Sequence, residues 1–181
     1  SGSDLIATLD GNDTVNGLGG NDKILGGAGA DTFDGGDGVD HLYGFASNDS
    51  LTGGAGNDYI VGGIGDDTIA GGDGDDTIEA QTGNDIITTG AGADTIYDGL
   101  GNDTITVDGS GVKTIDGGAG TDSLTISYTG ITSLSDFTIS QNGDYIVLTD
   151  GNRNSVSYKN IESLTVGSYT YTDVTSAKTY Y

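Results

Sequence analysis

One apolar side chain recurs every nine residues along most of this sequence. The series runs without a break from Val15 to Ile105 and then continues at Ile115 and Leu124, after steps of ten and nine residues. One residue is therefore inserted between Val107 and Lys113. The full series is Val15, Ile24, Phe33, Leu42, Leu51, Ile60, Ile69, Ile78, Ile87, Ile96, Ile105, Ile115 and Leu124. Self-similarity at a fixed period predicts a solenoid of stacked repeats.

Around each apolar residue the sequence follows the nine-position pattern Gly-Gly-x-Gly-x-Asp-x-U-x, in which U is apolar and stands at position eight. Clean copies begin at Gly26, Gly35, Gly53, Gly62 and Gly71, and weaker copies begin at Thr8, Gly17, Ala80, Thr89, Asp98 and Gly117. The glycines permit a turn of six residues, which leaves a strand of about three. Two copies then form one coil of 18 residues, and coils stack about 4.8 Å apart. No segment has helical periodicity.

The composition changes near residue 126. The first part of the chain holds 31 of the 35 glycines, whereas the part after residue 125 holds seven of the ten tyrosines. The later segments alternate in the manner of strands, and Asn142-Gly143 and Asp150-Gly151 are hairpin-type turns between them. We therefore predict an all-β chain with a parallel repeat domain at residues 8–125 and an antiparallel β cap at residues 126–181.

The charge of the chain excludes several classes of partner. The 181 residues carry a formal net charge of −23, with five Lys and Arg residues in total. This balance excludes nucleic acid, which is bound through basic patches, and argues against an anionic membrane surface. No apolar run approaches the roughly 20 residues of a transmembrane helix. A single histidine, His41, and the lack of any catalytic motif predict that the chain is not an enzyme.

The acidic residues are nearly all aspartates, and twelve of the 26 aspartates stand at position six. Because coils repeat every 18 residues, these aspartates fall on two edges of the stack. One edge carries Asp13, Asp31, Asp49, Asp67, Asp85, Asp103 and Asp122, and the other carries Asp22, Asp40, Asp58, Asp76 and Asp94. Like charges at this spacing repel one another. A hard cation between adjacent turns would reverse the sign of the interaction, and oxygen ligands without His or Cys favour calcium.

The repeat region also has a thin core, because it supplies one regularly placed apolar residue in every nine. Ordering the backbone of each residue costs free energy, and the burial of so few apolar side chains does not compensate for it. We therefore predict that the repeats are largely unfolded without calcium and fold when they bind it.

These repeats resemble the RTX (repeats-in-toxin) nonapeptide family over about two-thirds of the chain. The resemblance implies a right-handed parallel β-roll with about ten calcium ions held between the turns of repeats n and n+2. It also implies that backbone carbonyls of the glycine-rich turns bind calcium together with the aspartates. The carbonyls expected to do so are those of Gly26, Ala28, Gly29, Gly35, Asp37, Gly38, Gly53, Ala55, Gly56, Gly62, Ile64, Gly65, Gly71, Asp73 and Gly74.

The resemblance further implies export by the type I secretion machinery of a Gram-negative bacterium, through an uncleaved C-terminal signal. The absence of a basic and apolar N-terminal segment fits this expectation. Residues 169–181 are a candidate part of the signal, and Asn160–Leu164 resembles sequences that follow RTX arrays. The expected location is therefore extracellular or at the cell surface.

Two copies depart from the pattern. The copy at Gly44 has Phe45 and Ser47 in place of glycines, which puts the calcium sites of that turn in doubt. The copy over Val107–Asp116 lacks its aspartate, and we expect it to interrupt the ladder near Asp103 and Asp122.

The leading functional hypothesis is a non-enzymatic calcium-binding module that supports the secretion and folding of a larger adhesin or surface-layer protein. The alternative is a polysaccharide-binding module of an extracellular enzyme. In that case Tyr145, Tyr158, Tyr169 and Tyr171 would stack on sugars.

Overall fold

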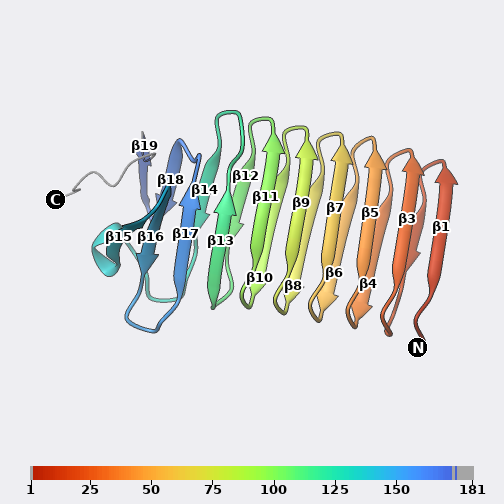
Figure 1. Ribbon diagram of the computed structural model, residues 1–181, viewed down its shortest axis with the longest axis horizontal. Coiled ribbons are helices and arrows are strands. Elements are labelled where there is room, and N and C mark those ends of the chain that lie inside the picture. The colour runs from red at the N-terminus through yellow and green to blue at the C-terminus, as the bar shows by residue number, and fades with distance from the viewer. Residues whose placement is uncertain (1, 173, 175–181) are drawn as a thin grey trace.

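The computed structural model describes residues 2–172 and 174, and in this part of the chain it shows a row of parallel strands stacked from one end of the molecule to the other (Figure 1). The strands are β1 (Leu5–Asp10), β2 (Thr14–Asn16), β3 (Lys23–Ala28), β4 (Thr32–Asp37), β5 (His41–Ala46), β6 (Ser50–Ala55), β7 (Tyr59–Ile64), β8 (Thr68–Asp73), β9 (Thr77–Thr82), β10 (Ile86–Ala91), β11 (Thr95–Leu100), β12 (Thr104–Val107), β13 (Val112–Asp116), β14 (Ser123–Ile126), β15 (Thr138–Asn142), β16 (Tyr145–Thr149), β17 (Ser155–Lys159), β18 (Ser163–Val166) and β19 (Tyr169–Thr172). One 3-10 helix, η1 (Leu134–Asp136), precedes β15.

The strands form two sheets that face each other. One sheet has the order β1-β3-β5-β7-β9-β11-β13-β17-β16-β15, and the other has the order β19-β18-β14-β12-β10-β8-β6-β4-β2. Within the repeats each strand pairs in parallel with the strand two further along the chain, as Ile24 with Leu42 and Leu42 with Ile60. Two nonapeptides therefore make one coil, and the predicted parallel β-roll is confirmed.

Most of the strands are longer than the three residues that the pattern predicts. Strand β3, for example, has six residues and extends from position seven of one copy to position three of the next. The ladder continues past the bend because position two adopts a positive φ, as at Gly27 (155°) and Gly36 (97°). This conformation is easily adopted by glycine, and it brings Gly27 opposite Phe45 on the neighbouring coil.

The core lies between the two sheets and consists of the residues at position eight. From Ile24 to Leu124 each of them is at most 1% exposed. Ile6 and Val15, in the coil nearest the N-terminus, are only partly buried and pack against this core. The core thus continues along the whole stack at the width of one or two side chains.

The inserted residue is absorbed in the turn between β12 and β13. After this turn the register returns, because Ile115 pairs with Ile96 and Leu124 pairs with Ile105. The hydrophobic column therefore continues through the irregular copy.

The C-terminal strands extend both sheets. Strand β17 pairs in parallel with β13, and β18 pairs in parallel with β14. Strands β16, β15 and β19 then add in antiparallel fashion. The antiparallel strands expected at this end are confirmed. Because both sheets run without a break past residue 125, the division into two domains at that residue stays a prediction.

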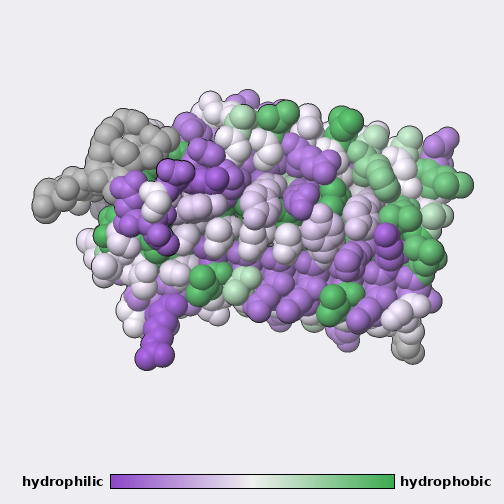
Figure 2. Space-filling view, in the orientation of Figure 1, coloured by the Kyte–Doolittle hydropathy of each residue, from purple (hydrophilic) through white to green (hydrophobic). Residues whose placement is uncertain are grey.

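Hydrophilic side chains cover much of the face seen in Figure 2, where apolar residues gather toward the N-terminal coils. Leu5, Leu9 and Leu18 of the first coil are about 70% exposed. In the part of the chain that the structure describes, none of the helical segments is long and apolar enough to cross a membrane.

Candidate metal centre

The structure brings the position-six aspartates together in two buried columns, one along each edge of the stack. Apart from Asp13, which is half-buried, each of the twelve predicted ligands is at most 3% exposed. The backbone N–H of each aspartate donates to Oδ1 of the aspartate one coil further on, as Asp40 does to Asp58 at 2.8 Å. Six such bonds run from Asp13 to Asp122, and four run from Asp22 to Asp94. Adjacent turns therefore form ten spaces that two aspartates each border, and we call these spaces cages.

Except at Asp94, the second carboxylate oxygen of these residues, Oδ2, has no hydrogen-bond donor. Among the described residues, buried Oδ2 atoms without a partner belong to Asp13, Asp22, Asp31, Asp40, Asp49, Asp58, Asp67, Asp76, Asp85, Asp98, Asp103 and Asp122. A buried polar atom without a partner is costly, and a buried charge is tolerated only when it is paired or coordinates a metal. The columns therefore present a regular series of oxygens that require a cation.

Position one borders each cage, and glycine occupies it in most copies. A Cβ on Gly53 would lie 2.5 Å from Asp58 Oδ2 and 2.6 Å from the carbonyl oxygen of Gly71 in the next coil. A side chain at position one would therefore point toward both of these oxygens. The carbonyl of Ala55, at position three, also faces the preceding coil, where it accepts a bond of 2.7 Å from the N–H of Gly38. Of the predicted carbonyls, that of Gly71 at position one thus lies near an aspartate Oδ2 of the preceding coil, whereas that of Ala55 at position three takes part in the ladder between the coils.

The corresponding space between Asp94 and Lys113, which only one aspartate borders and which we also call a cage, is filled by a cation of the chain itself. The side chain of Lys113 is fully buried, and its Nζ lies 2.6 Å from Asp94 Oδ2. The same Nζ is 2.8 Å from the carbonyl oxygens of Gly90 and Gly92, at positions two and four, and 3.4 Å from that of Ser110. The cage is therefore an oxygen-lined cation site, and its carbonyls come from both turns.

The interruption of the ladder lies on the other edge from the one that we expected. Lys113 stands two residues before Ile115 and so occupies position six, one coil after Asp94. Asp103 and Asp122 remain stacked, because Asp103 N–H donates to Asp122 Oδ1 at 2.9 Å. The expectation of a break near Asp103 and Asp122 was wrong, because the extra residue lies before Gly109 and the rest of the copy keeps its register. Gly109 and Gly111 stack on Gly90 and Gly92 at positions two and four, and Ile115 pairs with Ile96.

The turn at Gly44 keeps the conformation of the other turns. Phe45 and Ser47 adopt positive φ values of 77° and 84° in place of glycines. Asp49 is buried and accepts the N–H of Asp31 at 2.8 Å, like its counterparts. The geometry of the cages beside this turn is thus preserved, at the cost of backbone strain.

The carboxyl groups are difficult to ionise in this environment. Burial raises the pKa of Asp67 and Asp76 to about 7, and the neighbouring carboxylates one coil away add to the increase. The backbone N–H bonds lower the pKa in part. For the same leading reason the pKa rises to about 6 at Asp49, Asp58, Asp85 and Asp122. A cation in the cage would favour the ionised form.

Several residues of the columns escaped the sequence pattern. Asp4 belongs to one of the columns, because its N–H donates to Asp22 Oδ1 at 2.7 Å. The sequence indicates this through Ile6, which stands nine residues before Val15 and so takes position eight, two residues after Asp4. Glu162 accepts the N–H of Asp122 at 2.8 Å and so ends one column. It stands two residues before Leu164, as each position-six aspartate stands two residues before its apolar residue, and Leu164 pairs with Leu124. The carbonyls at position two were also missed, and the contact of Lys113 with Gly90 identifies them.

The residues present fit calcium. Carboxylate and carbonyl oxygens line the cages, which suits a hard cation with several oxygen ligands. The one histidine, His41, follows Asp40, and its ring packs against Tyr59. The aspartates at position six and the carbonyls at positions one to four are the groups that would hold it. The individual ligand assignments and the number of ions stay predictions.

Comparison with known proteins agrees with this chemistry. A family model described as the RTX calcium-binding nonapeptide repeat (4 copies) matches residues 1–33, 43–78 and 79–110, which together exceed half of the chain. A search of curated proteins gave no match.

Proposed function

The chain belongs to the RTX calcium-binding nonapeptide repeat family, and from this premise we propose that it is a non-enzymatic module whose repeats fold when they bind calcium. Calcium binding follows from the family. The proposal adds that calcium binding is coupled to folding. The observation that supports this coupling is the set of buried Oδ2 atoms without a hydrogen-bond donor. Stacking the coils buries these oxygens, so the folded state needs a cation that the unfolded chain does not.

The thin core supports the same coupling. Each copy contributes one regularly placed apolar side chain, while burial forces the carboxyl groups of two columns into a low-dielectric environment. A metal that binds the folded state and not the unfolded one stabilises it in proportion to the number of ions bound. Ten cages in series make this contribution large for a chain of this size.

We further propose that the module serves the secretion of a larger extracellular or cell-surface protein, of the adhesin or surface-layer type, from a Gram-negative bacterium. Its support is the typical occurrence of these repeats in secreted proteins and the coupling argued above. Low cytosolic calcium would keep the chain unfolded for the type I secretion machinery, and extracellular calcium would fold it. Part of the candidate secretion signal, Asp173 and residues 175–181, lies outside the described residues.

Far-UV circular dichroism of the whole chain tests the coupling. The spectrum in chelator should be that of a largely unfolded chain, and millimolar calcium should convert it into a β spectrum. Magnesium at the same concentration is the matched control and should have little effect, because it demands tight octahedral geometry and retains its waters. A β spectrum that is the same in chelator and in calcium would overturn the proposal.

The calcium concentration at the midpoint tests the secretion hypothesis separately. Folding at millimolar or high micromolar calcium would keep the chain unfolded in the cytosol and folded outside. Folding that is already complete at submicromolar calcium would refute the secretion role, although it would leave the coupling of binding to folding intact.

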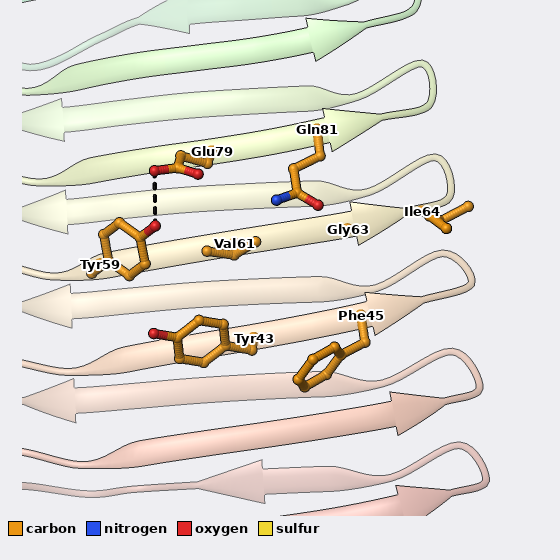
Figure 3. Close-up of a pocket in the computed structure, with 8 residues that line it drawn as sticks. All are labelled: Tyr43, Phe45, Tyr59, Val61, Gly63, Ile64, Glu79 and Gln81. Atoms are coloured by element: carbon orange, nitrogen blue, oxygen red, sulfur yellow. Dashed lines mark hydrogen bonds between the residues drawn. The ribbon is translucent and has the colours of Figure 1, made fainter.

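A second candidate function, polysaccharide binding, is supported by an aromatic cluster on the sheet face. Tyr43 and Phe45 of β5 stack with ring centroids 6.1 Å apart, and Tyr59 of β7 lies 6.0 Å from Tyr43. They line a pocket of about 340 Å³ together with Glu79 and Gln81 of β9 (Figure 3). Tyr59 donates to Glu79 Oε1 at 2.8 Å. Apolar faces with a few convergent polar groups are typical of ligand sites.

This cluster differs from the tyrosines that the sequence suggested. Tyr158 is 3% exposed and belongs to the core, so it cannot stack on a sugar. The net charge favours a neutral glycan. Affinity electrophoresis in neutral polysaccharides with calcium present tests the idea. Tyr43→Ala should lose any retardation, whereas Tyr97→Ala, at a half-exposed site on β11, should keep it. Absence of retardation in the wild type would exclude the glycans tested.

A further inference from the structure

Asp98 places a third carboxylate in one of the cages. It stands at position one, where most copies have glycine and the two preceding copies have Ala80 and Thr89. A Cβ at position one points into the cage, as the approach of Asp58 Oδ2 to a Cβ on Gly53 shows. Asp98 is fully buried there. One carboxylate oxygen from each of Asp98, Asp103 and Asp122 lies within 4.8 Å of the other two.

Each of the three carboxylates has one oxygen bonded to the backbone and one oxygen free. Oδ1 of Asp98 accepts the N–H of Gly99 at 2.7 Å, Oδ1 of Asp103 accepts that of Asp85 at 2.7 Å, and Oδ1 of Asp122 accepts that of Asp103 at 2.9 Å. The three Oδ2 atoms are buried and have no donor. The backbone thus fixes the orientation of the carboxylates before any ion arrives.

No cation of the chain neutralises this cluster. Among the described residues the ion pairs are Lys113 with Asp94 and Lys159 with Asp116, and neither includes a member of the cluster. Lys113 fills the corresponding cage on the opposite edge. The charge of Asp98, Asp103 and Asp122 must therefore be balanced by an ion from solution, and oxygen ligands of this charge favour a hard divalent cation.

We propose that Asp98 is a calcium ligand, and that the cage of Asp98, Asp103 and Asp122 is the tightest in the array and fills first. This inference rests on the proposed function, because it concerns the same ion. The affinity of an oxygen site for calcium rises with the charge of its ligands and with their rigidity. This cage has three carboxylates, whereas the general pattern of a cage has two.

This cage lies next to the C-terminal strands, so an ion that binds there first would affect their contact with the last coils. Asp122 donates its N–H to Glu162 Oε2 at 2.8 Å, and β14, which follows Asp122, pairs with β18 of the C-terminal strands. The first ion bound thus connects the last coils to the cap.

Calorimetric titration of the whole chain with calcium chloride, starting from the chelated state, tests the inference. Asp98→Gly restores the glycine of the repeat, and Asp98→Asn keeps the shape of the side chain. Asp144→Asn removes the same charge from an exposed turn of the cap and is the control. The wild type and the control should show one class of calcium binding about tenfold tighter than the rest, and both Asp98 variants should lose that class.

The remaining calcium binding and the β spectrum at saturation should be retained in the Asp98 variants. If their titrations coincide with that of the wild type, Asp98 is not a ligand and the inference fails. If they fail to reach the β spectrum at any calcium concentration, Asp98 has a structural role and the inference also fails. If calcium changes neither the heat nor the spectrum of the wild type, the proposed function fails and not merely this inference.

Discussion

The Nζ of Lys113 lies 2.6 Å from Oδ2 of Asp94, inside a cage that corresponds to those formed elsewhere by two aspartates. The ammonium contacts carbonyl oxygens from the turn of Asp94 and from its own turn. The chain thereby shows which atoms of the repeat solvate a cation. Lys113 also ends the column of aspartates on this edge. The last space of that column therefore holds a cation that is covalently part of the chain and cannot dissociate.

Removal of this ammonium should destabilise the calcium-saturated protein. In Lys113→Met the carboxylate of Asp94 loses its partner while it stays buried, and the methionine side chain occupies the space that an ion would need. Loss of one member of a buried pair costs about 3–5 kcal/mol, measurable as a lower urea midpoint at saturating calcium. Lys159→Met, which breaks the partly exposed pair with Asp116, is the control and should cost less than about 1 kcal/mol. Equal losses in the two variants would show that Asp94 does not depend on Lys113.

Loss of one position-six carboxylate should weaken calcium binding in the middle of the stack. Asp58 borders two cages, one shared with Asp40 and one shared with Asp76. Asp58→Asn should raise the calcium concentration at the folding midpoint several-fold, because affinity follows ligand charge. The matched control is Asp75→Asn, since Asp75 is exposed at position five, where other copies have asparagine with the same backbone bond. A midpoint that moves equally in both variants would point to net charge rather than to ligation.

Gly56 should tolerate no side chain, because its φ of 132° lies outside the left-handed values of 77° and 84° that Phe45 and Ser47 adopt. A Cβ on Gly56 would overlap the carbonyl oxygen of Gly38 in the preceding coil, whereas a Cβ on Gly143, in the hairpin between β15 and β16, would meet nothing within 4 Å. Both residues have a positive φ, so Gly143→Ala measures the backbone strain alone, about 1–2 kcal/mol. Gly56→Ala adds the steric overlap and should prevent the full β spectrum at saturating calcium. Similar stability of the two variants would contradict the close stacking of the coils.

Acid should partly replace calcium. In chelator, burial holds the pKa of Asp67 and Asp76 at about 7 in the folded coils, above the ordinary value of 3.8 that they have in the unfolded chain. A raised pKa stabilises the fold fully below the unfolded value, and this stabilisation is lost as the pH rises through about 7. The chelated chain should therefore have more β structure at pH 5 than at pH 8. A chelated spectrum that does not vary with pH over this range would count against the buried columns.

The sequence was sufficient to predict the coil and its columns, because the period of nine fixes both the apolar column and the aspartates. The pairing of Ile24 with Leu42 follows directly from two periods. The sequence was not sufficient to predict how the cap joins the stack. Strand β13 pairs with β17 across 43 residues, as Val112 does with Ser155. No repeat period encodes such a distant pairing.

Two features of the site were obscured by local irregularity. The ten-residue step concealed that Lys113 occupies position six, since counting in nines from Asp103 places that position at Val112. In the sequence Asp98 marks only the start of a weaker copy, because the direction of a side chain at position one depends on the backbone conformation of the turn. Conversely, Phe45 and Ser47 break the pattern yet keep the geometry, since left-handed backbone is strained but accessible to residues other than glycine.

The most direct test of the account is a crystal structure grown in calcium, with anomalous scattering used to locate the ions. The account predicts a calcium peak in each cage between two position-six aspartates, with the Oδ2 atoms as ligands, and the Nζ of Lys113 rather than an ion beside Asp94. Aspartate columns without anomalous peaks, or a calcium peak in the place of the Lys113 ammonium, would contradict it.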